Sequence, residues 1–148
     1  MIKINKNAPV ISSGTIEIEV EPENVWEILS NIEEWPRWNK DVKNAALDGE
    51  FEEGSKFRWK AGPGTIKSTI KELDPPRLMA WTGNTLGIKA IHIWKMKSIS
   101  NKTIVTTEES WEGILVRVMR SIMQKMLDES IESGLNFLKT EAELKYNR

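Results

Sequence analysis

The middle of the chain, from about Asp41 to Trp111, consists of short strand-like segments separated by tight-turn signals. The breaks, for example Gly83-Asn84, contain the glycine, proline, asparagine and aspartate residues that turns require. Segments of this length and spacing are typical of antiparallel strands joined by hairpins, so the sequence predicts a meander. The six predicted strands span residues 42–48, 56–60, 65–73, 77–82, 88–98 and 102–112.

The two ends of the chain add one more strand and two helical regions. Residues 15–20 alternate between apolar and polar side chains, which indicates a half-buried strand. Pro22 then suits the first turn of a helix, which must stop or restart near Pro36. From Gly113 to about residue 144 apolar side chains recur at helical steps, which predicts a helix roughly 45 Å long. Gly134 lies inside this helix and marks either a bend or a close contact.

This order of elements predicts an α+β fold. A strongly curved antiparallel sheet can wrap the long helix, with one sheet face covered and the other solvated. No linker-like or repeated segment divides the chain, so we expect a single domain over residues 1–148 with its core at about 13–144. A chain of 148 residues can bury a core of its own.

Composition excludes several classes of site. The 21 Lys and Arg residues nearly balance the 22 Asp and Glu residues, which argues against a nucleic-acid partner. The chain has no cysteine and one histidine, so thiolate and multi-histidine metal sites cannot form within it. We therefore expect no metal and no cofactor.

The longest uninterrupted apolar run is Leu78-Met79-Ala80-Trp81, far below the roughly 20 residues of a membrane-spanning helix. The first residues also lack the apolar stretch of a signal peptide. We expect a cytoplasmic protein without stable membrane insertion, present as a monomer or a homodimer.

The chain resembles the SRPBCC (START-like) superfamily, and more narrowly its polyketide cyclase/dehydrase-like branch, from about residue 13 to 143. The resemblance rests on four segments that occur in the family's order: Pro22-x-x-Val25-Trp26, Glu34-Trp35-Pro36-x-Trp38-Asn39-x-Asp41-Val42, Asp74-Pro75-Pro76-x-x-x-Ala80-Trp81 and Glu108-Glu109-Ser110-x-x-Gly113. It implies a helix-grip fold, in which a curved seven-stranded antiparallel sheet wraps a long C-terminal helix, with two short helices after the first strand. It also implies an apolar cavity for a small hydrophobic ligand such as a lipid, a polyketide or an aromatic compound.

Gly62-Pro63-Gly64 is similar to the glycine-rich loop of the pollen-allergen relatives in this superfamily. That loop precedes the third strand in those relatives, whereas this segment precedes the fourth predicted strand. A hairpin turn is therefore the favoured interpretation.

Tryptophan supplies seven of the eleven aromatic residues, and indoles suit the walls of a partly hollow interior. For any single Trp, filling of the core is the favoured interpretation, whereas for the set we favour the lining of a pocket. Flexible methionines on the long helix present the same choice between pocket and packing. The predicted cavity residues are Trp38, Trp59, Met79, Trp81, His92, Trp94, Trp111, Met119 and Met123.

His92 is the first weak candidate for catalysis. Alternation in residues 88–98 places it on the apolar face, opposite the lysines. There it could be a general base or a hydrogen-bond anchor for a ligand, but a packed core histidine is the favoured interpretation. Glu109 is the second candidate, and Glu17 is a further possible cavity carboxylate, because a buried carboxyl can exchange protons near neutral pH. The sequence does not decide which face of residues 102–112 points inward. The favoured expectation is that both carboxylates lie on the solvated face of the sheet.

Three functional hypotheses follow. The first is a non-catalytic protein that binds or carries a small hydrophobic molecule. The second is an enzyme of the cyclase, aromatase or dehydratase kind, which requires His92 near a carboxylate inside the pocket. The third is an interaction module with a filled core that works through its surface. We favour the first, so the chain is expected more as a binding protein than as an enzyme.

Overall fold

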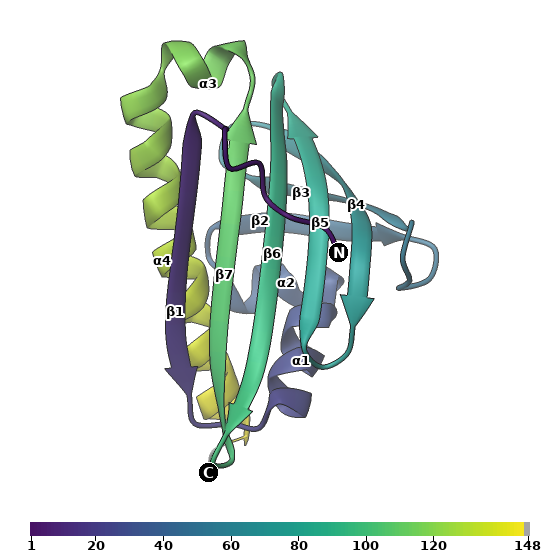
Figure 1. The fold of residues 1–148 in the computed structure, drawn as a ribbon. Coiled ribbons are helices and arrows are strands. Elements are labelled where there is room, and N and C mark those ends of the chain that lie inside the picture. Colours follow the sequence, from purple (N-terminus) through teal and green to yellow (C-terminus); the bar gives the residue numbers. More distant parts are fainter. Residues whose placement is uncertain (147–148) are drawn as a thin grey trace.

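The computed structural model describes residues 1–146 and contains one antiparallel sheet of seven strands (Figure 1). The strand order is β1-β7-β6-β5-β4-β3-β2, so the six later strands form a meander and the first strand pairs with the last. The strands are β1 (Val10–Ile18), β2 (Val42–Asp48), β3 (Lys56–Ala61), β4 (Thr65–Asp74), β5 (Leu78–Thr85), β6 (Ile88–Ile99) and β7 (Lys102–Glu112). The helices are α1 (Pro22–Ser30), the 3-10 turn η1 (Ile32–Glu34), α2 (Trp35–Trp38), α3 (Ile114–Val118) and α4 (Arg120–Tyr146).

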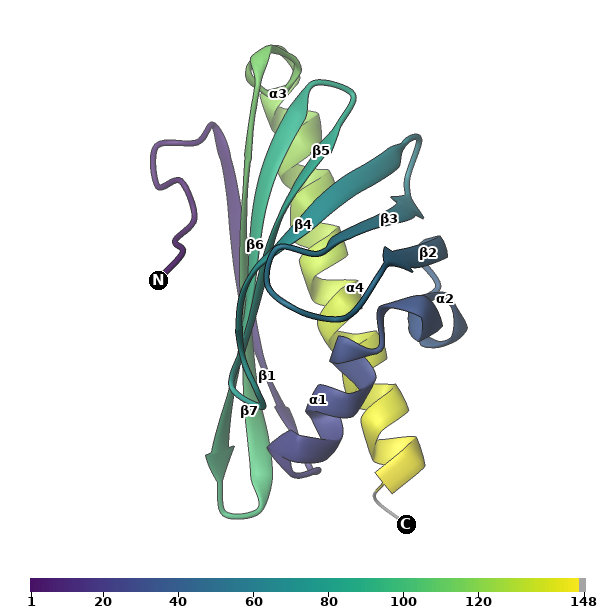
Figure 2. The ribbon, with the colours of Figure 1, turned by 90° about the vertical axis from the view of Figure 1, so that its right-hand side faces the viewer.

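The sheet curves around α4, with α1 and α2 on the same side of the sheet (Figure 2). Helix α4 is roughly 40 Å long, and its buried face packs Leu127, Ile131, Leu135 and Leu138 against the sheet. The predicted α+β helix-grip architecture is therefore confirmed. Among the described residues, no helix is long and apolar enough to cross a membrane.

The outer face of the sheet is covered in part, whereas the sequence predicted it to be solvated throughout. Ile2 and Ile4, from the segment before β1, pack against a small cluster of Leu78, Ala80 and Ile93. Figure 2 shows this segment on the side of the sheet that faces away from α4.

The first strand begins at Val10, earlier than predicted. The sequence does not reveal this start, because polar and small residues interrupt the apolar pattern of residues 10–14. Ser12 is buried and its hydroxyl donates to Asp128 Oδ1 at 2.6 Å. Gly14 lets α4 approach closely, since a Cβ there would lie 2.8 Å from Leu135 Cδ1. Both residues therefore serve the contact between β1 and α4.

The predicted long helix is divided. Met119 has φ −109° and ψ 37°, which ends α3 before α4 begins. Gly134 does not interrupt α4. It lies within α4 against Trp94, and a Cβ at this position would lie 3.8 Å from Trp94 Cη2.

The sequence predicted the turn between β5 and β6 at Gly83-Asn84, but the turn lies at Leu86-Gly87. Leu86 has φ 49° and Gly87 has φ 79°. Two consecutive residues with positive φ are the hallmark of a type I′ hairpin turn, which matches the twist of the flanking strands. Gly83 is therefore an inner residue of β5, and this placement matters for the cavity.

Candidate ligand-binding cavity

A cavity of about 670 Å³ lies between the inner face of the sheet and α4. Its walls come from β3 to β7, the β3–β4 and β5–β6 hairpins, Leu115 of α3, and Met123 and Met126 of α4. Polar groups also line it on the helix side, namely Asp41, Glu129, Ser130 and Ser133. Sites for small molecules typically enclose ~300–1,000 Å³ and are mostly apolar. The volume therefore fits a ligand of ordinary metabolite size.

The interior is hollow because small residues occupy inward positions of β3, β5 and β6. Ala61 of β3, Gly83 of β5 and Ala90 of β6 all line the cavity. Gly83 and Ala90 are direct partners across the β5–β6 pair. A Cβ at position 83 would lie 3.1 Å from both Ile66 Cγ2 and Ser68 Oγ, so the neighbouring strand leaves no spare room there.

Three tryptophans, Trp59, Trp81 and Trp111, form the aromatic part of the wall. Trp59 Nε1 donates to Ser68 Oγ at 3.0 Å, and Trp111 Nε1 donates to Glu109 Oε2 at 2.7 Å. These two donors are thus satisfied by the protein, and what the indoles offer to a ligand is apolar surface.

Trp35 of α2 supports this wall from behind. Its ring centroid lies 5.4 Å from those of Trp59 and Trp81, and its Nε1 donates to the Leu29 carbonyl at 2.9 Å. Offset and edge-on aromatic contacts at this distance add to the energy of burial. The Trp-Pro-x-Trp segment therefore fixes the orientation of cavity residues without lining the cavity itself.

His92 is buried among aromatic rings, with centroids 4.7 Å from Trp81 and 5.3 Å from Trp94. Its Nε2 lies 2.8 Å from Thr107 Oγ1, and that hydroxyl donates to the Ile93 carbonyl at 3.1 Å. Because the Thr107 proton is used in this way, Thr107 accepts from His92, which places the ring proton on Nε2. Burial lowers the pKa of His92 to about 3, so the ring is neutral near pH 7.

Glu109 is also buried and lies beside His92 in the cavity wall. The Nδ1 atom of His92 and Oε1 of Glu109 are 3.1 Å apart, but they are not aligned for a hydrogen bond. Burial raises the pKa of Glu109 to about 7, against the smaller lowering effect of the Trp111 hydrogen bond. The carboxyl can therefore gain or lose a proton near neutral pH.

Five of the nine predicted cavity residues come together at the cavity: Trp59, Trp81, His92, Trp111 and Met123. The other four lie elsewhere. Met79 and Trp94 are buried in the core, Trp38 is buried in α2, and Met119 lies partly exposed at the α3–α4 junction. That the five residues bind a ligand remains a prediction.

The two candidate carboxylates, Glu17 and Glu109, lie on opposite faces of the sheet. Glu17 is exposed, as expected, whereas the expectation that Glu109 is solvated is wrong, because Val105, Thr107 and Glu109 occupy the inner face of β7. Gly62-Pro63-Gly64 forms the β3–β4 hairpin, as predicted, and also lines the cavity.

Comparisons with known proteins agree with this architecture. No curated protein matches the chain. A hypothetical protein from Helicobacter pylori has a similar structure, with a TM-score of 0.80 at 16% identity over 96% of this chain and 97% of the other. A START superfamily protein from Mycobacterium smegmatis gives a TM-score of 0.73 at 16% identity, covering 90% and 97% of the two chains.

The Zhui aromatase/cyclase from Streptomyces sp. R1128 gives a TM-score of 0.77 at 16% identity, covering 90% of this chain and 93% of its own. At these identities the likeness to solved structures establishes the fold alone. The family described as "Polyketide cyclase / dehydrase and lipid transport" matches residues 9–143, nearly the whole sequence. The chain therefore belongs to the polyketide cyclase/dehydrase and lipid transport family.

Proposed function

We propose that the protein binds a small hydrophobic molecule with one polar group in the cavity, as a carrier or binding protein. The observation that carries this proposal is a 670 Å³ space with aromatic walls and a buried carboxyl, Glu109, at its inner surface. A filled core, as an interaction module would have, does not fit this volume.

Glu109 is the polar anchor in this proposal. Its Oε2 is held by Trp111 Nε1, and its pKa of about 7 lets it act as acceptor or donor near neutral pH. A hydroxyl or carbonyl group on the ligand would therefore find a partner there, while the aromatic walls cover the remainder of the molecule. Buried polar groups that pair with a ligand give orientation and specificity.

Binding of the neutral fluorophore N-phenyl-1-naphthylamine tests the proposal. Its fluorescence should rise on binding, and the emission of the wall tryptophans should be quenched in the same titration. Mass spectrometry of solvent extracts from purified protein should then identify a co-purified compound. The absence of both probe binding and an extracted compound would contradict the proposal.

A second candidate function is proton-transfer catalysis on the bound molecule. It is favoured by the 3.1 Å separation of His92 Nδ1 and Glu109 Oε1 inside the cavity wall. Their environments move the two pKa values in opposite directions, a pattern that also marks acid/base pairs in enzymes. Glu109 would exchange the proton, and His92, whose Nδ1 has no hydrogen-bond partner among the described residues, would position it.

Turnover of an identified ligand distinguishes the two functions. Conversion that is lost in Glu109→Gln while binding persists would establish catalysis. Release of the same compound unchanged after prolonged incubation would leave binding as the function.

A further inference from the structure

A surface feature distinct from the cavity lies at the end of the molecule that α3, the β5–β6 hairpin and the β3–β4 hairpin form. We call it the rim surface and define it as residues 60–67, 84–89 and 113–127. Its parts touch one another: a Cβ on Gly64 would lie 3.2 Å from Leu86 Cγ, and a Cβ on Gly113 would overlap the Gly87 carbonyl oxygen. Figure 1 shows α3 and the β5–β6 turn at the same end of the ribbon.

The rim surface exposes large apolar side chains. Ile114 is 82% exposed, Val118 78% and Leu86 62%, and Ile122 and Met126 lie exposed beside them. Exposed apolar groups that gather in one place mark sites of interaction with proteins or membranes. Leu86 and Met126 also line the cavity, so this apolar surface is continuous with the cavity wall.

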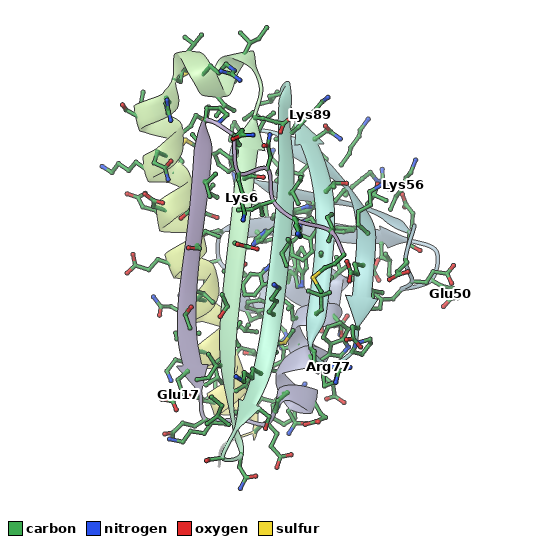
Figure 3. All side chains as sticks on the ribbon, viewed as in Figure 1. Lys6, Glu17, Glu50, Lys56, Arg77 and Lys89 are labelled. Carbon is green, nitrogen blue, oxygen red and sulfur yellow. The ribbon has the colours of Figure 1, made fainter. Side chains whose placement is uncertain are left out.

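Charge is segregated onto the same surface. The three segments carry six cations and no acidic residue, whereas the rest of the chain carries 15 Lys and Arg against 22 Asp and Glu. Within residues 1–146, none of the six takes part in an ion pair. Figure 3 labels Lys89 at this end and Glu17 at the opposite end. The six cations are Lys60, Lys67, Lys89, Arg117, Arg120 and Lys125.

Acidic residues flank the rim surface in the sequence. Glu112 accepts a hydrogen bond from Asn5, and Asp128 accepts hydrogen bonds from Ser12 and Gln124. These donors are neutral, so both carboxylates keep their charge, and Asp128 and Glu129 share a surface groove with Arg120 and Lys125. The excess positive charge of the rim surface therefore rests mainly on its other four cations, Lys60, Lys67, Lys89 and Arg117.

Leu86 points to a function for the apolar groups. A type I′ turn strongly prefers asparagine, aspartate or glycine at both central positions, and Leu86 occupies the first of them with φ 49°. The local backbone and the 62% exposure of the side chain both disfavour leucine here. A residue held in such a conformation is a reason to look for a binding role.

We propose that the rim surface docks onto an anionic lipid bilayer. Ile114, Val118 and Leu86 enter the interface between headgroups and acyl chains, while the cations contact lipid phosphates. A second copy of the chain would bring six further cations against the first six, so self-association through this face is opposed by charge. Docking brings the cavity rim to the bilayer, but the inference stands on the surface alone and needs no identified ligand.

Flotation with lipid vesicles tests the proposal. Wild-type protein should float with vesicles of phosphatidylcholine mixed with phosphatidylglycerol, but not with phosphatidylcholine alone, and added NaCl should release it. The double variant Arg117→Gln/Lys125→Gln should weaken binding, by roughly fivefold for each cation removed. Its matched control is Lys95→Gln/Lys97→Gln on β6, which removes two exposed cations outside the rim surface and should bind as wild type.

Leu86→Asn tests the apolar contribution without endangering the fold, because asparagine suits the turn better than leucine. It should lose vesicle binding while its free energy of unfolding stays equal or rises. Ile114→Ser/Val118→Ser should lose vesicle binding as well, with Leu144→Ser, an exposed leucine near the far end of α4, as the control.

Ile114 and Val118 do not line the cavity, so their double variant should still bind the neutral fluorophore. This separates failure of docking from failure of the proposed ligand binding. Equal binding to neutral and anionic vesicles, no binding to either, or equal losses in test and control variants would overturn the proposal. So would a dimer, seen by light scattering, that dissociates in the Leu86→Asn variant.

Discussion

His92 Nδ1 lies 3.1 Å from Glu109 Oε1, and both side chains are buried in the wall of the same cavity. Thr107 Oγ1 accepts a hydrogen bond from His92 Nε2–H, so the unprotonated nitrogen of the ring is the one that faces the carboxyl group. Burial disfavours the charged form of each residue, which holds the histidine neutral and keeps the carboxyl protonated up to a higher pH. The pair thus supplies a polar group in the cavity wall without a fixed charge in acidic solution.

The first prediction concerns the ionisation of His92. Because burial lowers its pKa to about 3, the imidazole should remain neutral where an ordinary histidine gains its proton. The chain has one histidine, so its ring signals in a proton NMR spectrum need no assignment by mutation. Between about pH 8 and about pH 5 they should lack the large change that protonation of an imidazole causes. A small step near pH 7 is expected from the neighbouring Glu109 carboxyl, 3.1 Å away, and should be absent in Glu109→Gln. A large titration centred near the ordinary value of 6.5 that persists in Glu109→Gln would show that the ring is solvated.

The second prediction concerns the stability contributed by Glu109. In the unfolded chain this carboxyl ionises near pH 4.5, and in the fold near pH 7. The folded state thus binds the proton more tightly, so stability is fully present below pH 4.5 and falls as the pH rises through 7. Glu109→Gln removes this ionisation, while its amide oxygen can still accept from Trp111 Nε1.

The measurement is urea unfolding of wild type and Glu109→Gln at about pH 5 and about pH 8. The wild type should lose stability relative to the variant between the two, by an amount of the order of a few kcal/mol. His92→Gln serves as the comparison variant. It keeps the Glu109 carboxyl, so its free energy of unfolding should fall between the two pH values as that of the wild type does. A wild-type-minus-Glu109→Gln difference that is the same at both pH values would contradict the burial of the carboxyl.

The third prediction uses the small residues that leave the interior hollow. Ala90→Phe places a ring in the cavity, so the affinity for N-phenyl-1-naphthylamine should fall at least about tenfold, or ~1.4 kcal/mol. The free energy of unfolding should stay equal or rise, because the ring fills existing space and does not overpack a dense core. Binding and urea unfolding are measured on the same preparation.

Ala46→Phe is the matched control for this variant. Ala46 lies directly opposite Arg58 on the outer face of the sheet, away from the cavity lining. Its probe affinity should equal that of wild type. If both alanine variants bound the probe equally well, the ligand site would lie outside the cavity.

Much of the fold follows from local patterns in the sequence. Alternation in β6 correctly places Ala90, His92 and Trp94 on one inner face, and turn residues locate most hairpins. The Leu86-Gly87 turn could not be located in this way, because leucine is a poor turn signal and Gly83-Asn84 is a better one. The break at Met119 likewise carries no proline or glycine.

The candidate site is predicted less completely than the fold, because a cavity forms where side chains leave space unfilled. Large apolar side chains correctly predict Trp59, Trp81 and Trp111 as cavity residues, but the same signal also selects Met79 and Trp94, which fill the core. The available signal was the opposite one: small residues at the inner positions of strands, such as Gly83 and Ala90. The parity of β7 was ambiguous, because residues on both of its faces are mixtures of polar and apolar side chains.

The last prediction contrasts two glycines that flank the cavity region. Gly134 lies in the interior of α4 with room for a methyl group, since the added Cβ would make an ordinary contact at 3.8 Å with Trp94 Cη2. Alanine is favoured over glycine inside helices, so Gly134→Ala should raise the free energy of unfolding by about 0.5–1 kcal/mol. The same measurement gives the opposite sign for Gly113, which links β7 to α3.

Gly113 has φ 137°, and an added Cβ would overlap the Gly87 carbonyl oxygen, which is backbone and cannot rotate away. Gly113→Ala should therefore lower the free energy of unfolding by at least about 1–3 kcal/mol. It should also separate α3 from the β5–β6 turn and raise amide hydrogen exchange in both segments. Because the two substitutions are chemically identical, opposite signs isolate the close approach at Gly113 from any general effect of alanine. A destabilised Gly134→Ala would instead mean that Trp94 lies closer to α4 than this packing allows.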